Sequence, residues 1–531
     1  MTRFLTIAAL LFSSAVGAQS FPFDVHLKTH NINNAPAIQS YSIGTHNGMW
    51  MVMGGRIDGL HQRQPWQSFN AAGENLSIYV IDPDSNYVWS APLSGFNNDS
   101  LEAQLKATNP NFHQEGDYLT VIGGYGLLNN VHITHPRITV IDVPQMIASI
   151  QQDGTVDTTA VWTTTDTLLQ NTGGRLHFKD SLYYLVGGHK FMGAYNPMGH
   201  NTYTQTYASA IRPFAYEIVA GEIEIDHYPA WVDTTELHRR DFNVTPMIDA
   251  SGYLYFTAWS GVFKHPMDMP FLNAVEFSDT GWSVVPNFFQ YYNHYHTASA
   301  SMFSTSTGSM YTGFFGGIAQ YYMQNGAMVQ DNNVPFVKTV SMVEKRLDGT
   351  YQEYVLPIEM PGYFGASAEF IYNPELFSLS HNIVELDSLG NDTITLGWIY
   401  GGINSPAKNV FFGNMTNNSS ASNNIVEVQL YRNSGIGWIE NNWSTGNLGV
   451  QIAPNPSRGE FSFYLECHKP IDHLSISINN VAGQEVWRNE LNNLSTGRSS
   501  QSFGELDLSP GIYHVTFSYE QVTHTVQWVV R

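Results

Sequence analysis

The sequence predicts an all-β protein, and three observations lead to this class. Apolar runs are short and are separated by turn-rich stretches of Gly, Asn, Ser and Thr. No amphipathic helical repeat stands out. Several apolar runs end in a pair of glycines, although glycine weakens the interior of a strand. With 531 residues, 43% of them hydrophobic, the chain can bury a large core in more than one domain.

The first 18 residues have the pattern of a secretory signal peptide. Arg3 supplies a positive charge, residues 4–12 are apolar, and Val16-x-Ala18 is a small-residue cleavage site. A membrane anchor needs about 20 apolar residues, and neither this segment nor a later one reaches that length. We therefore expect no transmembrane segment and an exported mature chain that begins at Gln19.

Apolar runs that end in glycine recur along the chain. Five copies carry a glycine pair, from "MWMVMGG" to "LGWIYGG", and a sixth, "GYLYFTAWSG", ends in a single glycine. The last glycines of the six copies are Gly55, Gly124, Gly188, Gly261, Gly317 and Gly402. Uneven spacing is expected when loops of different length join a fixed set of strands.

Each unit continues with a long loop, a strand, a short turn and a strand that bears an aromatic residue. The aromatic residues are Trp89, Trp162, Tyr228, Trp282, Tyr354 and Trp438. We expect the glycines to let a strand approach its neighbours closely, and the aromatic side chain to fill the wedge between neighbouring sheets.

This order of elements resembles the kelch motif, whose repeats form β-propellers with one four-stranded blade per repeat. The resemblance covers residues 38–440 and implies a six-bladed kelch-like β-propeller. Residues 19–37 form an N-terminal segment with two alternative roles. Part of it, residues 21–37, would either contribute to a seventh blade or close the ring by pairing with the last blade.

The composition changes after a polar linker at residues 441–449. Residues 450–531 alternate between strand-like runs and turn residues, and their length of about 80 residues suffices for a small β-sandwich that folds alone. We expect an Ig-like β-sandwich here.

The same segment resembles the type A C-terminal sorting domain of type IX secretion cargo in gram-negative bacteria. The residues that carry this resemblance are Pro454, Asn455, Pro456, Gly459, Gly483, Gly511 and Tyr513, with a basic Arg531 at the end. The resemblance implies export through the periplasm by the type IX secretion machinery. It also implies removal of the domain, with either release or attachment at the cell surface.

Charge and cysteine content exclude several functions. The formal net charge of −22 disfavours nucleic acid and anionic lipid surfaces as partners. Cys467 is the single cysteine, so no internal disulfide forms. Copper enzymes among the kelch propellers, such as galactose oxidase, need a Cys beside a Tyr in the propeller core, and Cys467 lies in the tail instead. Residues 82–84 and 115–117 read as turns rather than as paired catalytic carboxylates.

Two histidine pairs have a spacing that suits a metal ion, His294-Tyr295-His296 on a strand and, more loosely, His132-x-x-His135. No Cys, Asp or Glu nearby completes a metal shell at either pair. We expect no metal and no other cofactor.

The loops that follow the glycine pairs are long and mix aromatic residues with Asn, Gln and His. This composition suits contact with sugars or proteins, although such loops also pack on one another. The candidate binding residues are Trp66 and Tyr195 in these loops, and Arg175, Arg239, Arg240, His294 and His296 near the starts of innermost strands.

We expect an exported binding protein rather than an enzyme, with an unidentified glycan or protein ligand on the long-loop face. The alternative is a polysaccharide hydrolase or lyase that uses Arg175, Arg239, Arg240 and His294 in the central funnel. Arg, His and carboxylate groups that converge in a deep axial pocket would favour the enzyme. A channel plugged by apolar side chains would favour the binding protein.

Overall fold

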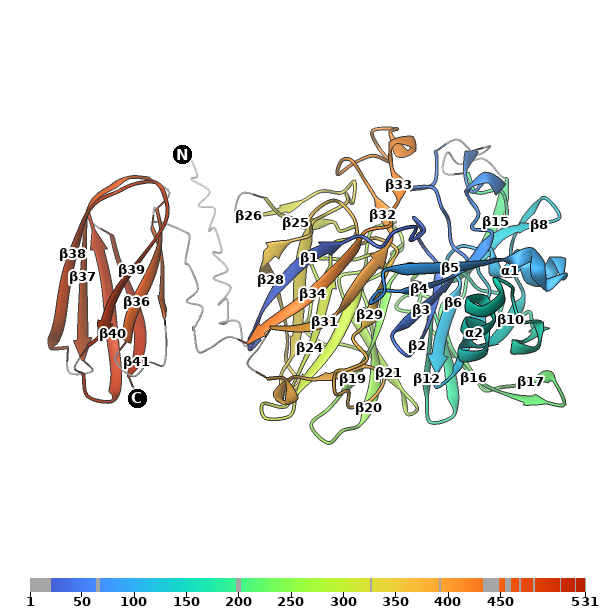
Figure 1. The fold of residues 1–531 in the computed structure, drawn as a ribbon, viewed down its shortest axis with the longest axis horizontal. Coiled ribbons are helices and arrows are strands. Elements are labelled where there is room, and N and C mark those ends of the chain that lie inside the picture. Colours follow the sequence, from blue (N-terminus) through green and yellow to red (C-terminus); the bar gives the residue numbers. More distant parts are fainter. Residues whose placement is uncertain are drawn as a thin grey trace, which may run out of the picture. The chain divides into compact units, whose positions relative to one another are not determined.

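The computed structural model in Figure 1 divides the chain into two compact units. One unit is Val25–Tyr431, and the other contains Arg432–Arg531 together with Met1–Asp24. The structure describes residues 21–531 except for 64–66, 197–201, 325–326, 391–392, 433–447, 454–459, 468, 481–482, 507, 521 and 531. The expected signal peptide and most of the expected linker lie outside the described residues.

Six sheets follow one another along the first unit, and each contains four strands that neighbour one another in a row. Sheet 1 is β2 (Ser42–His46), β3 (Met49–Met53), β4 (Ser77–Asp82) and β5 (Tyr87–Pro92), and sheet 2 is β6 (Asn111–Glu115), β7 (Tyr118–Ile122), β10 (Arg137–Asp142) and β11 (Val161–Thr165). Sheet 3 is β12 (Arg175–Lys179), β13 (Leu182–Val186), β16 (Ala210–Val219) and β17 (Glu222–His227), with β18 (Trp231–Val232) beside β16.

Sheet 4 is β19 (Asn243–Ile248), β20 (Leu254–Trp259), β21 (Ala274–Ser278) and β22 (Gly281–Val284). Sheet 5 is β23 (Ser299–Ser304), β24 (Ser309–Phe315), β27 (Thr339–Lys345) and β28 (Tyr351–Glu359), with β30 (Val384–Glu385) beside β23. Sheet 6 is β29 (Ala368–Tyr372), β31 (Thr393–Gly401), β34 (Ile425–Arg432) and β1 (Phe23–His30). Of the two alternatives for residues 21–37, the structure shows the pairing with the last sheet.

The glycine-ended runs form the second strands of these sheets, and their backbone explains the repeat. In all five pairs both glycines have a positive φ, between 56° and 87°. In the sixth copy Ser260 takes the place of the first glycine and has the same left-handed conformation, with a φ of 47°, followed by Gly261 at 91°. L-residues disfavour this conformation, so the sequence selects glycine at nearly every copy.

The same hydrogen bond recurs after each run and connects each sheet to the next. The amide of the last glycine donates to a carbonyl that lies a few residues before the following sheet begins. The pairs are Gly55 to Ala107, Gly124 to Asn171, Gly188 to Arg239, Gly261 to His294, Gly317 to Phe364 and Gly402 to Ile38. Ile38 precedes sheet 1, so the sixth bond leads from the last sheet back to the first.

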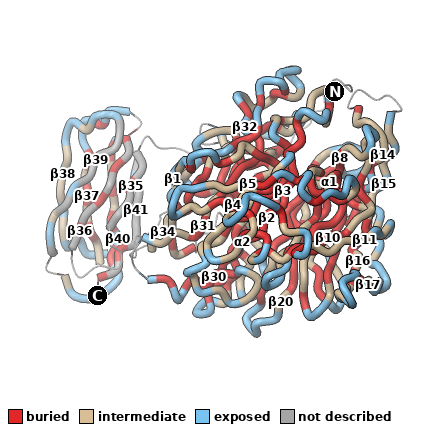
Figure 2. Tube along the Cα trace, turned by 45° about the vertical axis from the view of Figure 1, so that its right-hand side comes forward, coloured by how far each residue is buried: buried red, intermediate tan, exposed pale blue. Residues whose placement is uncertain are grey.

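Hydrophobic clusters fill the spaces between neighbouring sheets, and buried residues dominate the interior of the unit (Figure 2). Trp89 and Trp162 pack against the clusters that join sheets 1 and 2 and sheets 2 and 3, as expected of wedge-filling residues. Trp282 packs between sheets 3 and 4. The same expectation was wrong for Tyr228, which lies beyond the end of β17 and is 47% exposed. Trp438 lies outside the described residues.

Elements outside the six sheets occupy the long connections. Two of the long loops pair with each other in a further four-stranded sheet, formed by β8 (Tyr125–Leu128), β9 (Val131–Thr134), β14 (His189–Gly193) and β15 (Tyr203–Tyr207). Two hairpins are β25 (Tyr321–Gln324) with β26 (Ala327–Gln330), and β32 (Ile403–Asn404) with β33 (Ser420–Ala421). Two short helices, α1 (Asp99–Leu105) and α2 (Val143–Asp153), are elements that the sequence pattern did not predict.

The second unit consists of two sheets around one core. One sheet is β35 (Leu448–Ala453), β36 (Glu460–Cys467) and β39 (Gly497–Glu505), and the other is β38 (Glu485–Leu494), β37 (Ile471–Asn480), β40 (Gly511–Tyr519) and β41 (Val522–Val530). Their shared core contains Phe461, Phe463, Val515 and Phe517, all fully buried. Cys467 is buried in the same core, and burial raises the pKa of its thiol.

We expect the first unit to fold without the second, because each unit has a core of its own. A chain truncated after Glu440 should keep nearly the same thermal unfolding midpoint for the first unit, measured by calorimetry. It should also accumulate in the periplasm of its native host. Unfolding of the truncated chain, or its arrival outside the cell, would contradict this prediction.

Candidate functional site

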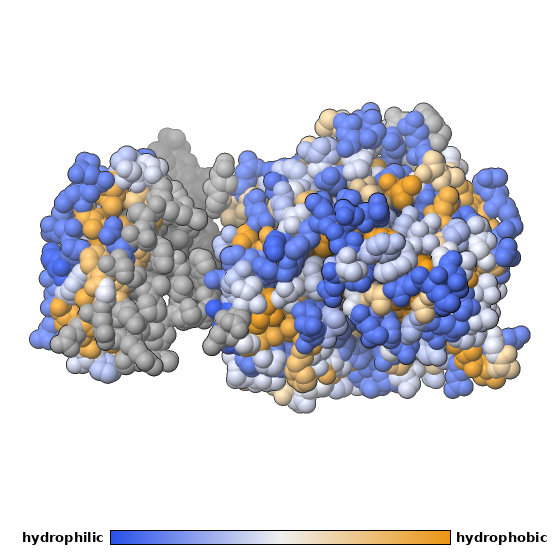
Figure 3. All heavy atoms as spheres, in the orientation of Figure 1, coloured by the Kyte–Doolittle hydropathy of each residue, from blue (hydrophilic) through white to orange (hydrophobic). Residues whose placement is uncertain are grey.

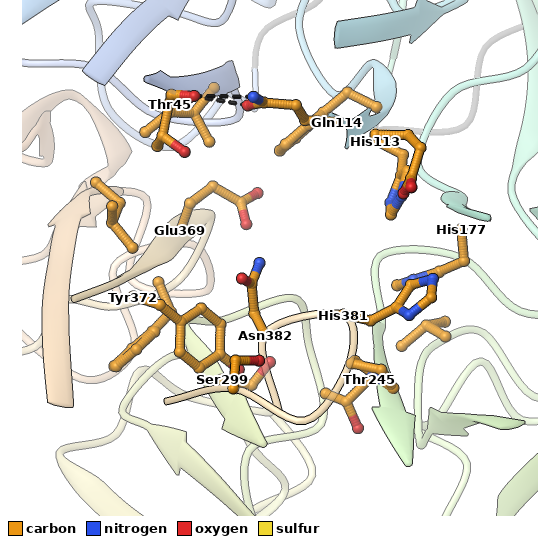
Figure 4. Close-up of a pocket in the computed structure, with 18 of the residues that line it drawn as sticks. Thr45, His113, Gln114, His177, Thr245, Ser299, Glu369, Tyr372, His381 and Asn382 are labelled. Atoms are coloured by element: carbon orange, nitrogen blue, oxygen red, sulfur yellow. Dashed lines mark hydrogen bonds and ion pairs between the residues drawn. The ribbon is translucent and has the colours of Figure 1, made fainter. Parts of the chain in front are cut away.

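The first strands of all six sheets surround a central cavity of 740 Å³. Each strand contributes a polar side chain to its wall (Figure 4). In sheet order these residues are Thr45, His113, His177, Thr245, Ser299 and Glu369. The wall of the central cavity therefore carries hydroxyl, imidazole and carboxylate groups beside apolar residues such as Ile43, Leu176 and Val244, which leave the cavity open.

A segment from sheet 6 covers part of the central cavity. In sheet 2 the first two strands are joined by a tight turn at residues 115–117, as the sequence predicted, but in sheet 6 they are joined by a connection of about twenty residues. Within it, residues 373–385, here called the cap, reach sheet 5, where β30 pairs in parallel with β23. The cap places His381 and Asn382 in the cavity wall, with φ values of 47° and 61°.

Three imidazoles gather on one side of the central cavity. The ring centroid of His113 lies 6.0 Å from that of His177 and 6.4 Å from that of His381. Burial, with the neighbouring charges of His113 and Arg175, holds the pKa of His177 well below its ordinary value. Burial and the charge of His113 also lower the pKa of His381. Within the described residues, no three His, Cys, Asp or Glu side chains form a group that could hold a metal ion.

Glu369 anchors a buried ionic network at the inner end of the central cavity. His296 Nε2 lies 2.9 Å from Glu369 Oε1, and Arg175 Nη1 lies 3.4 Å from the same oxygen. Burial alone would raise the pKa of Glu369, but the charges of His296 and Arg175 lower it. The carboxylate is thus ionised and already engaged by the Arg175 guanidinium and the His296 imidazole.

A second cavity, here called the loop cavity, has a volume of 460 Å³ and is formed largely by the long loops. His61, Tyr195, Phe263 and Asn332 come from four of the long loops that follow glycine-ended runs. The loop cavity is rich in aromatic rings, which also include Phe69, Tyr295, Phe336, Phe411 and Phe412. His296 lines it as well, so the ionic network lies between the two cavities.

Arg240 and Asp241 form the main charged pair of the loop cavity. Arg240 Nη1 donates to Asp241 Oδ2 over 2.6 Å, and Arg240 Nε donates to the Tyr207 hydroxyl over 3.2 Å. The guanidinium carbon lies 4.7 Å from the centroid of the Phe263 ring. Burial would lower the pKa of Arg240, but Asp241 and the neighbouring tyrosines raise it above its ordinary value. Asp241 also accepts a hydrogen bond from Asn109 Nδ2 over 2.8 Å.

The predicted binding residues have three different locations. Arg175 lines the central cavity, and Arg240, His296 and Tyr195 line the loop cavity. Arg239 lines neither cavity, because its buried guanidinium donates to the carbonyls of Ser260 and Asn273. Trp66 lies outside the described residues.

His294 is fully buried, bonded to the Gln290 carbonyl and to the amide of Gln320. The strand expected at His294-Tyr295-His296 is absent from the described structure, because these residues form an irregular connection before β23.

Comparisons with known proteins identify the second unit. Residues 451–531 match the family model of the secretion system C-terminal sorting domain. In this domain Gly483 has a φ of 79° in the turn after β37, Gly511 begins β40, and the Tyr513 hydroxyl donates to the Ser509 carbonyl over 2.7 Å. Pro454, Asn455, Pro456 and Gly459 lie outside the described residues.

No curated protein matches the chain. Among solved structures it is similar to a novel fungal alcohol oxidase of the AA5 family in complex with copper, at 10% identity, covering 95% of this chain and 99% of that one, with a TM-score of 0.37. It is also similar to YjhT, at 10% identity, covering 70% and 92%, with a TM-score of 0.40. The WD40 domain of SCAP from fission yeast matches at 7% identity, covering 95% and 98%, with a TM-score of 0.28.

Within the described residues, no helix has the length and apolar character that a membrane crossing requires. On the face shown in Figure 3, hydrophobic residues occur in several separate groups among hydrophilic ones. Residues 451–531 are a secretion system C-terminal sorting domain, and this domain marks the protein for export by type IX secretion to the cell surface or the extracellular space.

Proposed function

We propose that the six sheets are the blades of a six-bladed kelch-like propeller, and that this exported propeller binds a glycan in the loop cavity. The recurring glycine hydrogen bond supports the propeller, because the bond from Gly402 to Ile38 leads from the last sheet back to the first. An Ig-like sorting domain at the C-terminus directs the propeller out of the cell.

The observation that carries the binding function is the Arg240–Asp241 pair within a cavity of aromatic rings. A carboxylate accepts and a guanidinium donates, so the two side by side can bond to neighbouring hydroxyls of a sugar. Aromatic faces such as Tyr195 and Phe263 pack against the apolar faces of sugar rings. The volume of 460 Å³ falls within the range of about 300–1,000 Å³ that small-molecule sites occupy.

Polysaccharide cleavage is the second candidate, and the central cavity is the observation that favours it. Arg175, Glu369 and imidazoles converge there, which is the arrangement expected of the enzyme. Two facts favour binding instead. Glu369 is engaged by His296 and Arg175, so it is not a free general base, and Arg239 and His294, two residues expected to act, line neither cavity.

The test is a glycan array followed by calorimetric titration of the glycans that bind. Arg240→Gln should weaken the affinity by about tenfold or more, because the charged donors of the guanidinium are lost. Arg137→Gln is the matched control, since Arg137 is also half-buried but bonds to Thr163 away from both cavities. Equal affinity in the two variants, with both folded, would overturn the proposed site.

The same glycans, incubated with the wild-type protein and assayed for new reducing ends or unsaturated products, separate binding from cleavage. We expect no products. Catalytic turnover that is lost in Glu369→Gln would establish the enzyme instead.

A further inference from the structure

The proposed function leaves the central cavity unused, although it is the larger of the two. We propose that the central cavity is a second binding site, and that it takes a compact ligand with a carboxylate group, of the sugar-acid class, between His113 and His381. The ligand would enter on the cap side, and its hydroxyls would face the polar residues of the inner strands.

The first argument is the hydrogen-bonding state of the imidazoles. The Nε2 atoms of His113 and His381 are buried and form no hydrogen bond of good geometry, although the Glu115 carboxylate and the Phe178 backbone lie close to these two imidazoles. Glu115 Oε2 lies 3.7 Å from His113 Nε2, which is too long for a well-formed hydrogen bond. Buried polar atoms are nearly always well paired in proteins, so two imidazole nitrogens without a well-aligned partner on one cavity wall indicate room for a further acceptor. A carboxylate has two oxygens that could accept from both imidazoles.

The second argument is the shape and polarity of the cavity. A volume of 740 Å³ exceeds what a monosaccharide-sized ligand needs, and the wall carries the hydroxyls of Thr45, Thr245 and Ser299. Across the cavity, Phe370 and Tyr372 offer aromatic surface. The cavity thus combines an imidazole side for an acidic group with hydroxyl and aromatic sides for a sugar ring.

The third argument is the cap. His381 and Asn382 are consecutive residues in the left-handed conformation, which costs about 1–3 kcal/mol for each non-glycine residue. Because of this conformation, both side chains face the central cavity (Figure 4). Parallel pairing of β30 with β23 fixes the far end of the cap on sheet 5. Strain that is maintained by pairing at a cavity wall is typical of ligand sites.

Because of the charges around the imidazoles, the affinity for a carboxylate should depend on pH. The charged groups that face them are Glu115 on β6, Arg175 on β12, Asp180 in the turn after β12, and Glu369 on β29. Glu369 is balanced by Arg175, which leaves the acidic Glu115 and Asp180 in excess while His177 and His381 are neutral. Protonation of His177 and His381 reverses that balance. Affinity for an anion should therefore rise as the pH falls, and binding should take up protons.

The experiment titrates the full-length protein with D-glucuronate by calorimetry at about pH 5 and about pH 8, near the limits of the histidine range. D-glucose serves as the neutral ligand. We expect glucuronate to bind at least about tenfold more tightly at the lower pH, and glucose to show no such dependence. Titration in buffers of different ionisation enthalpy should show proton uptake.

Substitutions assign the binding to this cavity. His381→Gln should reduce the pH dependence and His113→Gln should weaken the binding of glucuronate, whereas His227→Gln should change neither, because His227, on β17, pairs with Asp166 outside both cavities. Two variants on different elements keep the test valid if one of them fails to fold. No binding of glucuronate, or equally tight binding of inorganic phosphate, would overturn the proposal. Loss of glucuronate binding in Arg240→Gln would place the ligand in the loop cavity instead.

Discussion

Gly123→Ala should destabilise the first unit by about 4 kcal/mol or more, which is a large part of the free energy that keeps a typical domain folded. A Cβ atom at Gly123 would lie 1.8 Å from the carbonyl oxygen of Asn171, and the residue has a φ of 66°. That carbonyl accepts the hydrogen bond from Gly124 that joins sheet 2 to sheet 3. The clash is with backbone, so relief requires the two sheets to separate. Chemical denaturation followed by tryptophan fluorescence measures the loss.

Gly116→Ala is the matched control for this prediction. Gly116 also has a positive φ, 55°, but a Cβ atom added there, in the turn between β6 and β7, would meet nothing within 4 Å. Gly116→Ala should therefore cost only the free energy of placing a side chain at a positive φ, about 1 kcal/mol. If the two variants lose equal stability, the close approach of the sheets is not what selects glycine.

Glu353→Gln should remove a fall in stability between about pH 4.5 and about pH 8. Burial raises the pKa of the Glu353 carboxyl to about 8, and the amides of Tyr291 and Tyr292 that donate to it offset this only in part. The carboxyl group is interior although the residue as a whole is half-buried. A glutamine carries no charge, and its single side-chain oxygen accepts one of the two amide hydrogen bonds, because Tyr291 and Tyr292 donate to different oxygens of Glu353.

The direction of this pH dependence of stability follows from proton linkage. Below the pKa that Glu353 has in the unfolded chain, its carboxyl is protonated in both the folded and the unfolded state, and the full contribution of the protonated group to stability is present. As the pH rises, the unfolded chain ionises first, and the folded state loses relative stability until the pH passes the folded pKa. The total change is on the order of 5 kcal/mol. Urea unfolding at about pH 5 and about pH 8 should show a smaller difference in the variant than in the wild type.

Glu359→Gln provides the control, because Glu359 is exposed on the same strand, β28. It should retain the pH dependence of the wild type. A wild-type protein that is equally stable at both pH values, or a Glu359→Gln variant that behaves like Glu353→Gln, would contradict the assignment to Glu353.

The glycine-ended runs could be located from the sequence because their cause is local. A left-handed residue at the end of a strand is a property of a single position, and glycine satisfies it at the lowest cost. Ser260 shows the limit of this pattern, since a residue other than glycine has the same conformation there. The aromatic pattern was less reliable. Packing between sheets depends on where a strand ends, and β17 ends at His227, one residue before Tyr228.

The central cavity could not be predicted in the same way. Glu369 lies in an ordinary run, "GASAEFIYNP", and only the assembled sheets show that its side chain faces Arg175 and His296. His381 reaches the cavity because the cap crosses to sheet 5, a contact that local sequence does not encode. Arg239 and His294 were misleading for a related reason. Each lies at a junction between sheets, where its own carbonyl accepts the glycine hydrogen bond.

Pairing of β1 with β34 has a consequence for how the first unit folds. The contact between His30 and Glu427, which belongs to this pairing, joins residues that are 397 positions apart. Contacts of such separation carry a high entropic cost of loop closure, and a high contact order slows folding. Until the last strands are synthesised, β1 has no neighbour and its edges stay open to pairing with other chains. The first unit therefore completes the sheet that contains β1 only in its last folding step, after almost the whole of its sequence has been synthesised.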